Sequence, residues 1–201
     1  AYAITARRCG FHREHLVAFF SSMRADLTQR EYSPSELQAY IYGSAEAIGL
    51  LCLQIFLAEE DVSPADRAAM ERGARALGSA FQKINFLRDL SEDSSTLGRT
   101  YFQQVQSGRI DETSKSALIA EIRRELATAA LTIDLLPASA RVGVSAAADI
   151  FAELTNRLAA TPATALATTR VSVPNHTKAW LAARAVRRRG HSSQTSATAE
   201  N

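Results

Sequence analysis

The pattern of hydrophobic and polar positions along the chain predicts helices almost throughout. Apolar residues recur at the three- and four-residue spacing of a helical face, whereas the two-residue alternation of a strand is nearly absent. We therefore expect an all-α fold, a bundle of long helices joined by short loops.

Capping signals mark where two of these helices begin. In "YSPSE", Ser33 can cap a helix, Pro34 suits its first position, and Glu36 completes a capping box. "SPAD" repeats the signal at Ser63. The predicted helical segments are residues 3–29 with a break at Gly10, 34–58, 64–93, 113–135, 139–158, and a last one that begins after Pro174.

These segments predict one helical domain over residues 1–188. The residues after it, 189–201, read "RGHSSQTSATAEN", a polar stretch that we expect to be a disordered tail. The longest apolar run, "AEAIGLLCLQIFLA", has about 14 residues and is shorter than the roughly 18–20 that cross a membrane.

Composition and charge change this picture little. The chain has 201 residues, of which 46% are hydrophobic and 22% charged, as in an ordinary globular domain with its own core. The net charge of +2 gives no reason to expect nucleic acid as a partner.

One predicted helix carries an unusual column of polar side chains. In "LGSAFQKINFLRDLSED", Gly78, Gln82, Asn85, Asp89 and Asp93 follow one another at spacings of 4, 3, 4 and 4, which is one helical face. The two carboxylates would repel each other unless a cation lies between them. A solvated helix end is the alternative, although acidic residues there oppose the helix dipole.

The oxygen atoms of this column suit a hard divalent cation. Mg²⁺ is commonly held by one or two carboxylates together with substrate phosphates and water, with Mn²⁺ as a second option. Asn85 adds a neutral oxygen, Gln82 can hydrogen-bond what the metal holds, and Gly78 leaves space for an apolar group. Spacing alone leaves the metal site and the solvated helix end both open.

A second segment, "YIYGSAEAIGLL", combines a polar stripe with two glycines. Tyr40, Ser44 and Ile48 share one helical face, and Gly43 and Gly49 lie nearby. Glycine inside a helix costs roughly 1 kcal/mol relative to alanine, so a ligand or a partner helix is expected to approach closely. Tyr40 itself could equally be a core residue whose hydroxyl has found a partner.

Together the two segments, in their order and separation, closely resemble the squalene/phytoene synthase family, and the chain looks like the C-terminal portion of a bacterial phytoene synthase-like enzyme. "RVSVPNHTK" is similar to the family's C-terminal R-V-x-V segment with a trailing lysine, which here gives Arg170 and Lys178. The family's second aspartate-rich motif, N-x-x-R-D-x-x-x-D followed by R-x-Y, matches Asn85, Arg88, Asp89, Asp93, Arg99 and Tyr101.

The resemblance implies an isoprenoid synthase-type helical bundle that condenses two prenyl diphosphates head-to-head. Mg²⁺ would bridge aspartates to diphosphate, and a cyclopropyl diphosphate would form as an intermediate. We expect two geranylgeranyl diphosphates to give phytoene in carotenoid biosynthesis. A squalene-type synthase that uses farnesyl diphosphate is one alternative, and a non-catalytic or truncated relative that acts as an assembly or scaffold protein is another.

The matched motifs also imply roles for single residues. Tyr40, Asp89 and Asp93 would be catalytic, with Tyr40 facing the reacting carbons. Asn85, Asp89 and Asp93 would be the metal ligands. The residues expected to bind substrate are Gly43, Ser44, Gly49, Gly78, Gln82, Arg88 and Arg170.

Several positions depart from the family pattern. Its first aspartate-rich motif has no counterpart here, and the chain begins with Ala1 rather than Met, so we expect that motif upstream and expect this chain alone to be inactive. Glu46 stands where many members have glycine, and Phe151 where many have tyrosine. Asp26 matches a recurrent acidic position whose role stays open.

The expected location is the cytoplasm. Because the substrates are long hydrocarbons, peripheral contact with the inner face of the cytoplasmic membrane is a further expectation, with "RAVRRR" near the C-terminus as the basic segment that would approach the lipid. A solvated helix end is the plainer explanation of that basic run. The sequence does not indicate an oligomeric state.

Overall fold

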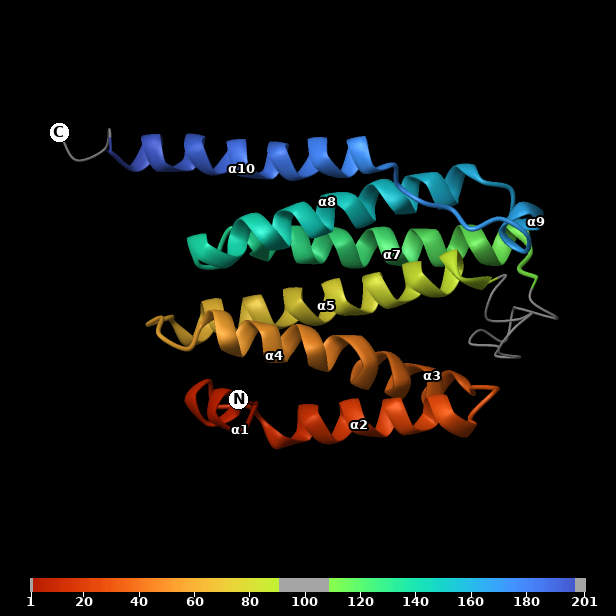
Figure 1. Cartoon of the computed structure of the whole chain (residues 1–201), viewed down its shortest axis with the longest axis horizontal. Coiled ribbons are helices and arrows are strands. Elements are labelled where there is room, and N and C mark those ends of the chain that lie inside the picture. The colour runs from red at the N-terminus through yellow and green to blue at the C-terminus, as the bar shows by residue number, and fades with distance from the viewer. Residues whose placement is uncertain (1, 91–108, 198–201) are drawn as a thin grey trace.

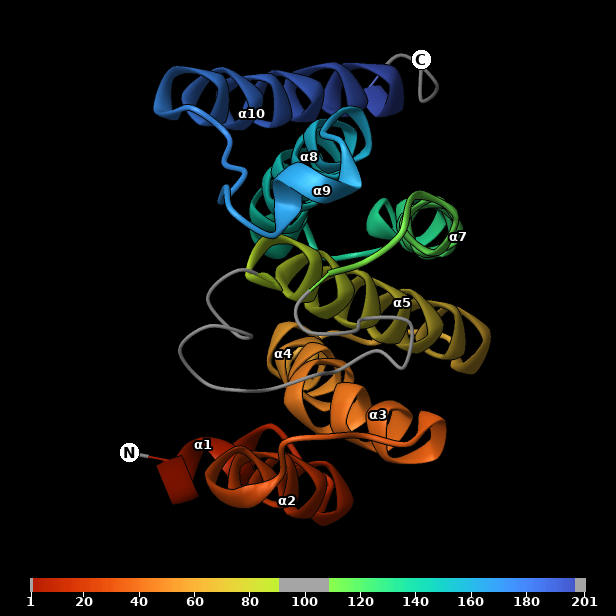
Figure 2. The same cartoon turned by 90° about the vertical axis from the view of Figure 1, so that its right-hand side faces the viewer.

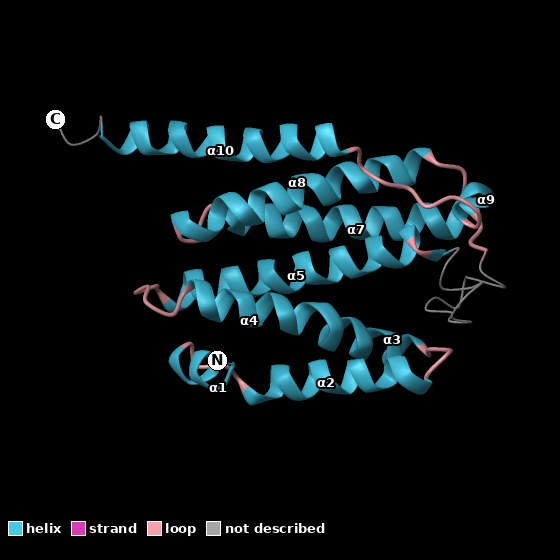
Figure 3. Cartoon of the chain, in the orientation of Figure 1, coloured by secondary structure: helices cyan, strands magenta, loops and turns pink. Residues whose placement is uncertain are grey.

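The computed structural model describes residues 2–90 and 109–197, and every regular element in those two ranges is a helix (Figure 3). The prediction of an all-α fold is confirmed. In chain order the elements are α1 (Tyr2–Arg8), α2 (Arg13–Thr28), α3 (Pro34–Ile41), the π-helical turn η1 (Tyr42–Glu46), α4 (Ala47–Phe56), α5 (Pro64–Arg88), α7 (Glu112–Ile133), α8 (Ala138–Ala160), α9 (Ala163–Leu166) and α10 (Asn175–Ala197).

The long helices lie in successive layers with α5 in the middle (Figures 1 and 2). One edge is formed by α1 and α2, followed by the segment from α3 to α4, and α10 forms the opposite edge. The central helix α5 packs against α4 and η1 on one side and against α7 and α8 on the other. Side chains of α5 therefore reach both halves of the bundle.

Local capping interactions begin the helices where the sequence predicts. The Ser33 hydroxyl accepts from the Glu36 backbone N–H, and the Glu36 carboxylate accepts from the Ser33 N–H at 2.8 Å, which completes the capping box. Ser63 accepts from the Asp66 N–H at 3.1 Å. Gly10 separates α1 from α2 with a φ of +63°, a conformation that glycine adopts without a Cβ penalty.

The helical segment after Pro34 differs from the prediction in two ways. Its middle is the π-helical turn η1, which packs against α2 and α5. The whole segment Pro34–Phe56 has 23 residues and a mean hydropathy of 1.4 in its most apolar window, so it is long and apolar enough to span a membrane. The sequence analysis considered only the uninterrupted apolar run of about 14 residues, whereas this criterion counts the whole helical segment with its polar positions. Core helices of soluble proteins meet the same criterion, and 39% of this window is buried within the chain.

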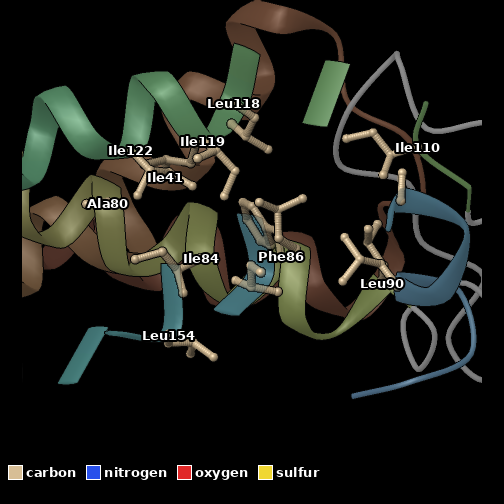
Figure 4. Close-up of a cluster of buried hydrophobic side chains, with 14 of the residues drawn as sticks. Ile41, Ala80, Ile84, Phe86, Leu90, Ile110, Leu118, Ile119, Ile122 and Leu154 are labelled. Carbon is tan, nitrogen blue, oxygen red and sulfur yellow. The ribbon is translucent and has the colours of Figure 1, made fainter. Parts of the chain in front are cut away.

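The main core lies where α5, α7 and α8 meet (Figure 4). Ile84 and Leu87 on α5, Ile122 on α7 and Leu158 on α8 are completely buried. Each such side chain contributes about 1.5–3 kcal/mol relative to an exposed one. The packing of these side chains holds the C-terminal end of α5 in place.

Two predicted boundaries differ from the structure: the end of the helix predicted over residues 64–93, and the start of the predicted C-terminal tail. The regular part of α5 ends at Arg88, and Asp89 is its C-cap with φ −99° and ψ 9°. Asp93, Arg99 and Tyr101 lie outside the described residues. At the other end, α10 is helical through Ala197, where a disordered tail was predicted from residue 189. Once a helix has formed, each further residue adds one backbone hydrogen bond, and this stretch contains no proline to stop it.

Candidate functional site

The C-terminal half of α5 carries the predicted polar column. Gly78, Gln82 and Asn85 are helical, and Asp89 follows as the C-cap residue. From Gly78 to Asp89 the helix rises about 16 Å, at 1.5 Å per residue. Of these residues, only Gly78 lines the apolar pocket described below.

Two arginines bind the Asp89 carboxylate. Arg88 donates from Nε to Oδ1 at 2.8 Å and from Nη2 to Oδ2 at 2.5 Å. Arg170, which is 81 positions away in the chain and lies between α9 and α10, donates from Nε to Oδ1 at 3.0 Å. The structure thus joins three of the predicted site residues, Arg88, Asp89 and Arg170.

Asn85 offers a buried oxygen to a divalent cation, whereas both Asp89 oxygens accept hydrogen bonds from arginines in the structure. The Asn85 Oδ1 atom is buried and has no hydrogen-bond partner among the described residues. A buried oxygen left in this way costs about 1–3 kcal/mol, and a cation that prefers oxygen ligands would remove that cost. The third predicted ligand, Asp93, is outside the described residues.

Tyr40 is a core residue with a polar partner. Its ring packs against Tyr32, with centroids 5.1 Å apart, and against Phe86 at 6.1 Å. Its hydroxyl donates to Asp26 Oδ1 at 2.8 Å. This contact accounts for an acidic residue that the sequence left without a role, because Asp26 holds the Tyr40 hydroxyl in place.

An apolar pocket of about 570 Å³ lies between α4, α5, α7 and α8. Ser44, Gly49 and Gly78 line it, and their predicted role in binding a prenyl tail stays a prediction. Both glycines also allow close helix packing, because a Cβ on Gly49 would come within 2.7 Å of the Ala74 carbonyl oxygen, and one on Gly78 within 2.7 Å of the Ala45 carbonyl oxygen.

Gly43 does not belong to this pocket, in contrast to the prediction. A Cβ there would lie 2.3 Å from both the Ala18 carbonyl oxygen and the Ser22 hydroxyl, so the residue faces α2. The π-helical turn that contains Gly43 packs closely on α2. Gly43 therefore serves helix packing, the alternative that the sequence had left open.

Sequence reasoning missed the wall that α8 contributes to the pocket. Ser139, Gly143 and Ala147 line it at intervals of four residues, so small side chains at helical spacing were the available signal. Phe151 continues α8 and stacks on Phe81 of α5, with ring centroids 3.8 Å apart. The phenylalanine that replaces a family tyrosine thus packs directly beside the pocket.

A buried ion-pair network on another face of α5 was also missed. Lys83 Nζ donates to Glu121 Oε1 at 2.6 Å and to Glu125 Oε1 at 2.5 Å, and Ser79 donates to Glu125 at 2.9 Å. Burial lowers the pKa of Lys83, but the hydrogen bonds to the two glutamates outweigh it and leave that pKa raised. Burial raises the pKa of Glu125. These groups line a separate cavity of about 700 Å³.

The chain matches known proteins along most of its length. The model of the family "Squalene/phytoene synthase" matches residues 1–177. A "Bifunctional lycopene cyclase/phytoene synthase" of Blakeslea trispora is 29% identical over 136 residues, covering 59% of this chain and 22% of that protein. "Phytoene synthase 3, chloroplastic" of Zea mays is 43% identical over 86 residues, covering 41% of this chain and 19% of that protein.

The chain spans about a fifth of the length of these two curated relatives. Among solved structures, squalene synthase HpnC from Alicyclobacillus acidocaldarius is similar at a TM-score of 0.49 and 16% identity, covering 77% of this chain and 59% of that one. The family match over residues 1–177 shows that the chain belongs to the squalene/phytoene synthase family.

Proposed function

We propose that this chain forms part of a Mg²⁺-dependent prenyltransferase that condenses two geranylgeranyl diphosphates head-to-head into phytoene, through a cyclopropyl diphosphate, in carotenoid biosynthesis. One observation carries the proposal: a single helix, α5, has a carboxylate bound by two arginines at its end and an apolar pocket along its preceding turns. A lipid diphosphate has the same division into an anionic head and an apolar tail. The names of the curated relatives favour phytoene as the product.

The diphosphate head would bind at the end of α5. Asn85 and Asp89 would hold Mg²⁺, with Asp93 completing the set, and the bound ion would neutralise charge that develops on the departing diphosphate. Arg88 and Arg170 would donate charge-assisted hydrogen bonds to the same oxygens. Both arginines pair with Asp89 in the structure, so binding of Mg²⁺ to this carboxylate would release their donors to the diphosphate oxygens.

The prenyl tail would lie in the pocket lined by Ser44, Gly49 and Gly78. Burial of apolar surface contributes about 25 cal/mol per Å², so a tail held along the pocket gains affinity without polar contacts. The stacked rings of Phe81 and Phe151 would exclude water from the allylic carbons. Tyr40 would face the reacting carbons, with its hydroxyl held by Asp26.

The test uses the protein encoded by the complete reading frame that contains this chain, beside the 201 residues alone. Each is incubated with Mg²⁺ and either geranylgeranyl diphosphate or farnesyl diphosphate, and the products are identified by mass. We expect a C40 hydrocarbon from the first substrate with the complete protein, and no product from the 201 residues alone. Asp89→Ala should lower turnover at least a hundredfold, because transition-state charge is left unbalanced.

Arg170→Gln should lower turnover about tenfold, since one of two guanidinium donors is lost. Arg157→Gln is the matched control, because Arg157 also pairs with a carboxylate at 2.7 Å, but with that of Glu153 on its own helix, α8. A C30 product would support the squalene-type alternative. A folded complete protein that is inactive with both substrates would contradict catalysis and support the scaffold alternative.

A further inference from the structure

A second group of metal-ligating side chains lies at the start of α2. His12, Glu14 and His15 each offer a donor atom, and these three atoms lie within 4.8 Å of one another. His12 Nδ1 is 3.8 Å from Glu14 Oε1, and the two imidazole rings stack with centroids 5.5 Å apart. None of these residues takes part in the site at the end of α5.

His15 is the member of this group that is held in place by a hydrogen bond. It is buried, and its Nδ1 lies 2.9 Å from the hydroxyl of Tyr42 in η1. Metal-bound histidines commonly use their second ring nitrogen in such a hydrogen bond, which sets the tautomer and leaves Nε2 for the metal. Tyr42 is itself held, because the guanidinium of Arg75 lies 5.4 Å from its ring centroid and pairs with Glu46 at 2.8 Å.

The other two side chains can complete a coordination sphere. Ligand bonds of about 2.0–2.2 Å in a tetrahedral site place neighbouring donors about 3.3 Å apart. The donor atoms lie farther apart than this, at 3.8 Å between His12 and Glu14 and within 4.8 Å for all three, so the side chains must move to close on an ion. The side chains of His12 and Glu14 are 63% and 72% exposed, so both can rotate inward without repacking the core. His15 would be the fixed ligand, and His12 and Glu14 would close on the ion.

We propose that His12, Glu14 and His15 bind one divalent transition-metal ion of the zinc class, with water in the remaining position. Two imidazoles and one carboxylate suit Zn²⁺, Co²⁺ or Ni²⁺, whereas Mg²⁺ prefers a set made entirely of oxygen ligands. Through the His15–Tyr42 hydrogen bond, the ion would link the start of α2 to η1, the turn between α3 and α4.

The surrounding charge does not supply this binding. The adjoining cavity of about 460 Å³ is lined by Arg67, Arg72 and Arg75 together with Glu71, all on α5. These arginines raise the local positive potential, so long-range attraction of a cation is weak. Direct ligand bonds must provide the affinity, which makes the site sensitive to loss of any one ligand.

The test titrates the 201-residue chain with Zn²⁺ by calorimetry and with Co²⁺ by visible absorption, in excess Mg²⁺. We expect one ion per chain and Co²⁺ bands typical of nitrogen coordination. His12→Ala and Glu14→Gln should each weaken binding about tenfold or more, and Tyr42→Phe about tenfold through the second ring nitrogen of His15. His176→Ala, which removes an exposed histidine on α10, should leave binding unchanged.

His12 and Glu14 are exposed, so their substitutions should preserve the fold, which helical circular dichroism will check. Zn²⁺ should also raise the midpoint of thermal unfolding of the unsubstituted chain and not that of His12→Ala, because an ion that binds only the folded state stabilises it. The proposal is overturned if the chain binds no ion, if His12→Ala and Glu14→Gln bind as tightly as the parent, or if His176→Ala weakens binding equally. None of these outcomes bears on the prenyltransferase proposal, which concerns Asp89.

Discussion

At the scale of single residues, the surroundings decide what a glycine does. Gly43 faces α2 so closely that a Cβ would lie 2.3 Å from a backbone oxygen of Ala18, which cannot move aside. Gly143 is also inside a helix, α8, but a Cβ there would meet no atom within 4 Å. Helix propensity alone would predict the same effect of a substitution at both positions. The packing around each glycine predicts different effects.

We predict opposite effects when these glycines become alanine. Gly43→Ala should lower the free energy of unfolding by about 1–3 kcal/mol, because α2 and η1 are forced apart. Gly143→Ala should raise it by about 0.5–1 kcal/mol, since alanine is the better helix former and has space. Urea unfolding followed by circular dichroism measures both. Equal changes in the two variants would contradict the close contact at Gly43.

At the scale of helices, side-chain caps hold several helix ends. Asp111 precedes α7, and its carboxylate accepts from the Ser114 backbone N–H at 2.8 Å and from the Ser114 hydroxyl at 2.7 Å. These hydrogen bonds lower the pKa of Asp111 from its usual value of 3.8. The start of α7 therefore depends on an ionised carboxylate.

This cap predicts an acid-sensitive contribution to stability. Because the folded pKa of Asp111 lies below the unfolded one, the contribution is present above about pH 4 and is lost as pH falls through the folded pKa. Asp111→Ala should lower the urea midpoint near neutral pH. In acid, the variant and the unsubstituted chain should have the same urea midpoint. Asp111→Asn, which keeps a capping oxygen that does not titrate, should instead retain its stability relative to Asp111→Ala in acid.

We predict a larger loss of stability when the ion pairs between α5 and α7 are removed than when the Asp111 cap is removed. Lys83, whose side chain is 10% exposed, pairs with Glu121 and Glu125. Lys83→Met should cost about 3 kcal/mol of unfolding free energy, because it leaves the half-buried Glu125 carboxylate without its cation. Adding Glu125→Leu should recover most of that loss.

The control for Lys83 is the exposed ion pair between Arg8 and Glu59. Glu59→Gln should change stability by less than about 1 kcal/mol. If Lys83→Met were equally mild, or if the second substitution deepened the loss, burial of the network would not be the source of its effect.

At the scale of the whole molecule, α10 lies at one edge and packs mainly on α8. Its exposed surface combines apolar and basic side chains: Trp180 and Val186 are each 58% exposed, and Lys178 and Arg187 are also exposed. We propose that this surface touches anionic lipid at the inner face of the cytoplasmic membrane, close to where an apolar substrate would be taken up.

Sedimentation with liposomes tests the proposed contact. Binding to phosphatidylserine vesicles should weaken as salt screens the basic groups. Replacing Lys178 and Arg187 by glutamine should weaken it about thirtyfold, at about 1 kcal/mol per charge near the surface. Arg123→Gln, an exposed arginine on α7, is the control. Binding that ignores both salt and these substitutions would contradict the proposal.

The features that the sequence determined by itself are local ones. Helical periodicity, the capping box at Ser33 and the break at Gly10 depend on residues within a few positions of one another, so they can be recognised without the fold. The same holds for the order of Gln82, Asn85 and Asp89 along α5, because neighbouring turns of one helix set their spacing.

Only the tertiary structure decided which distant residues meet. Arg170 reaches Asp89 across 81 positions, and the apolar pocket needs walls from four helices, so neither follows from any local pattern. The contacts of Tyr40 with Asp26, of Gly43 with Ala18 and of Lys83 with α7 also join residues that are distant in the chain, so no local pattern predicts them. Burial of many apolar side chains at once fixes how whole helices pack, and that collective free energy has no signature in a short stretch of sequence.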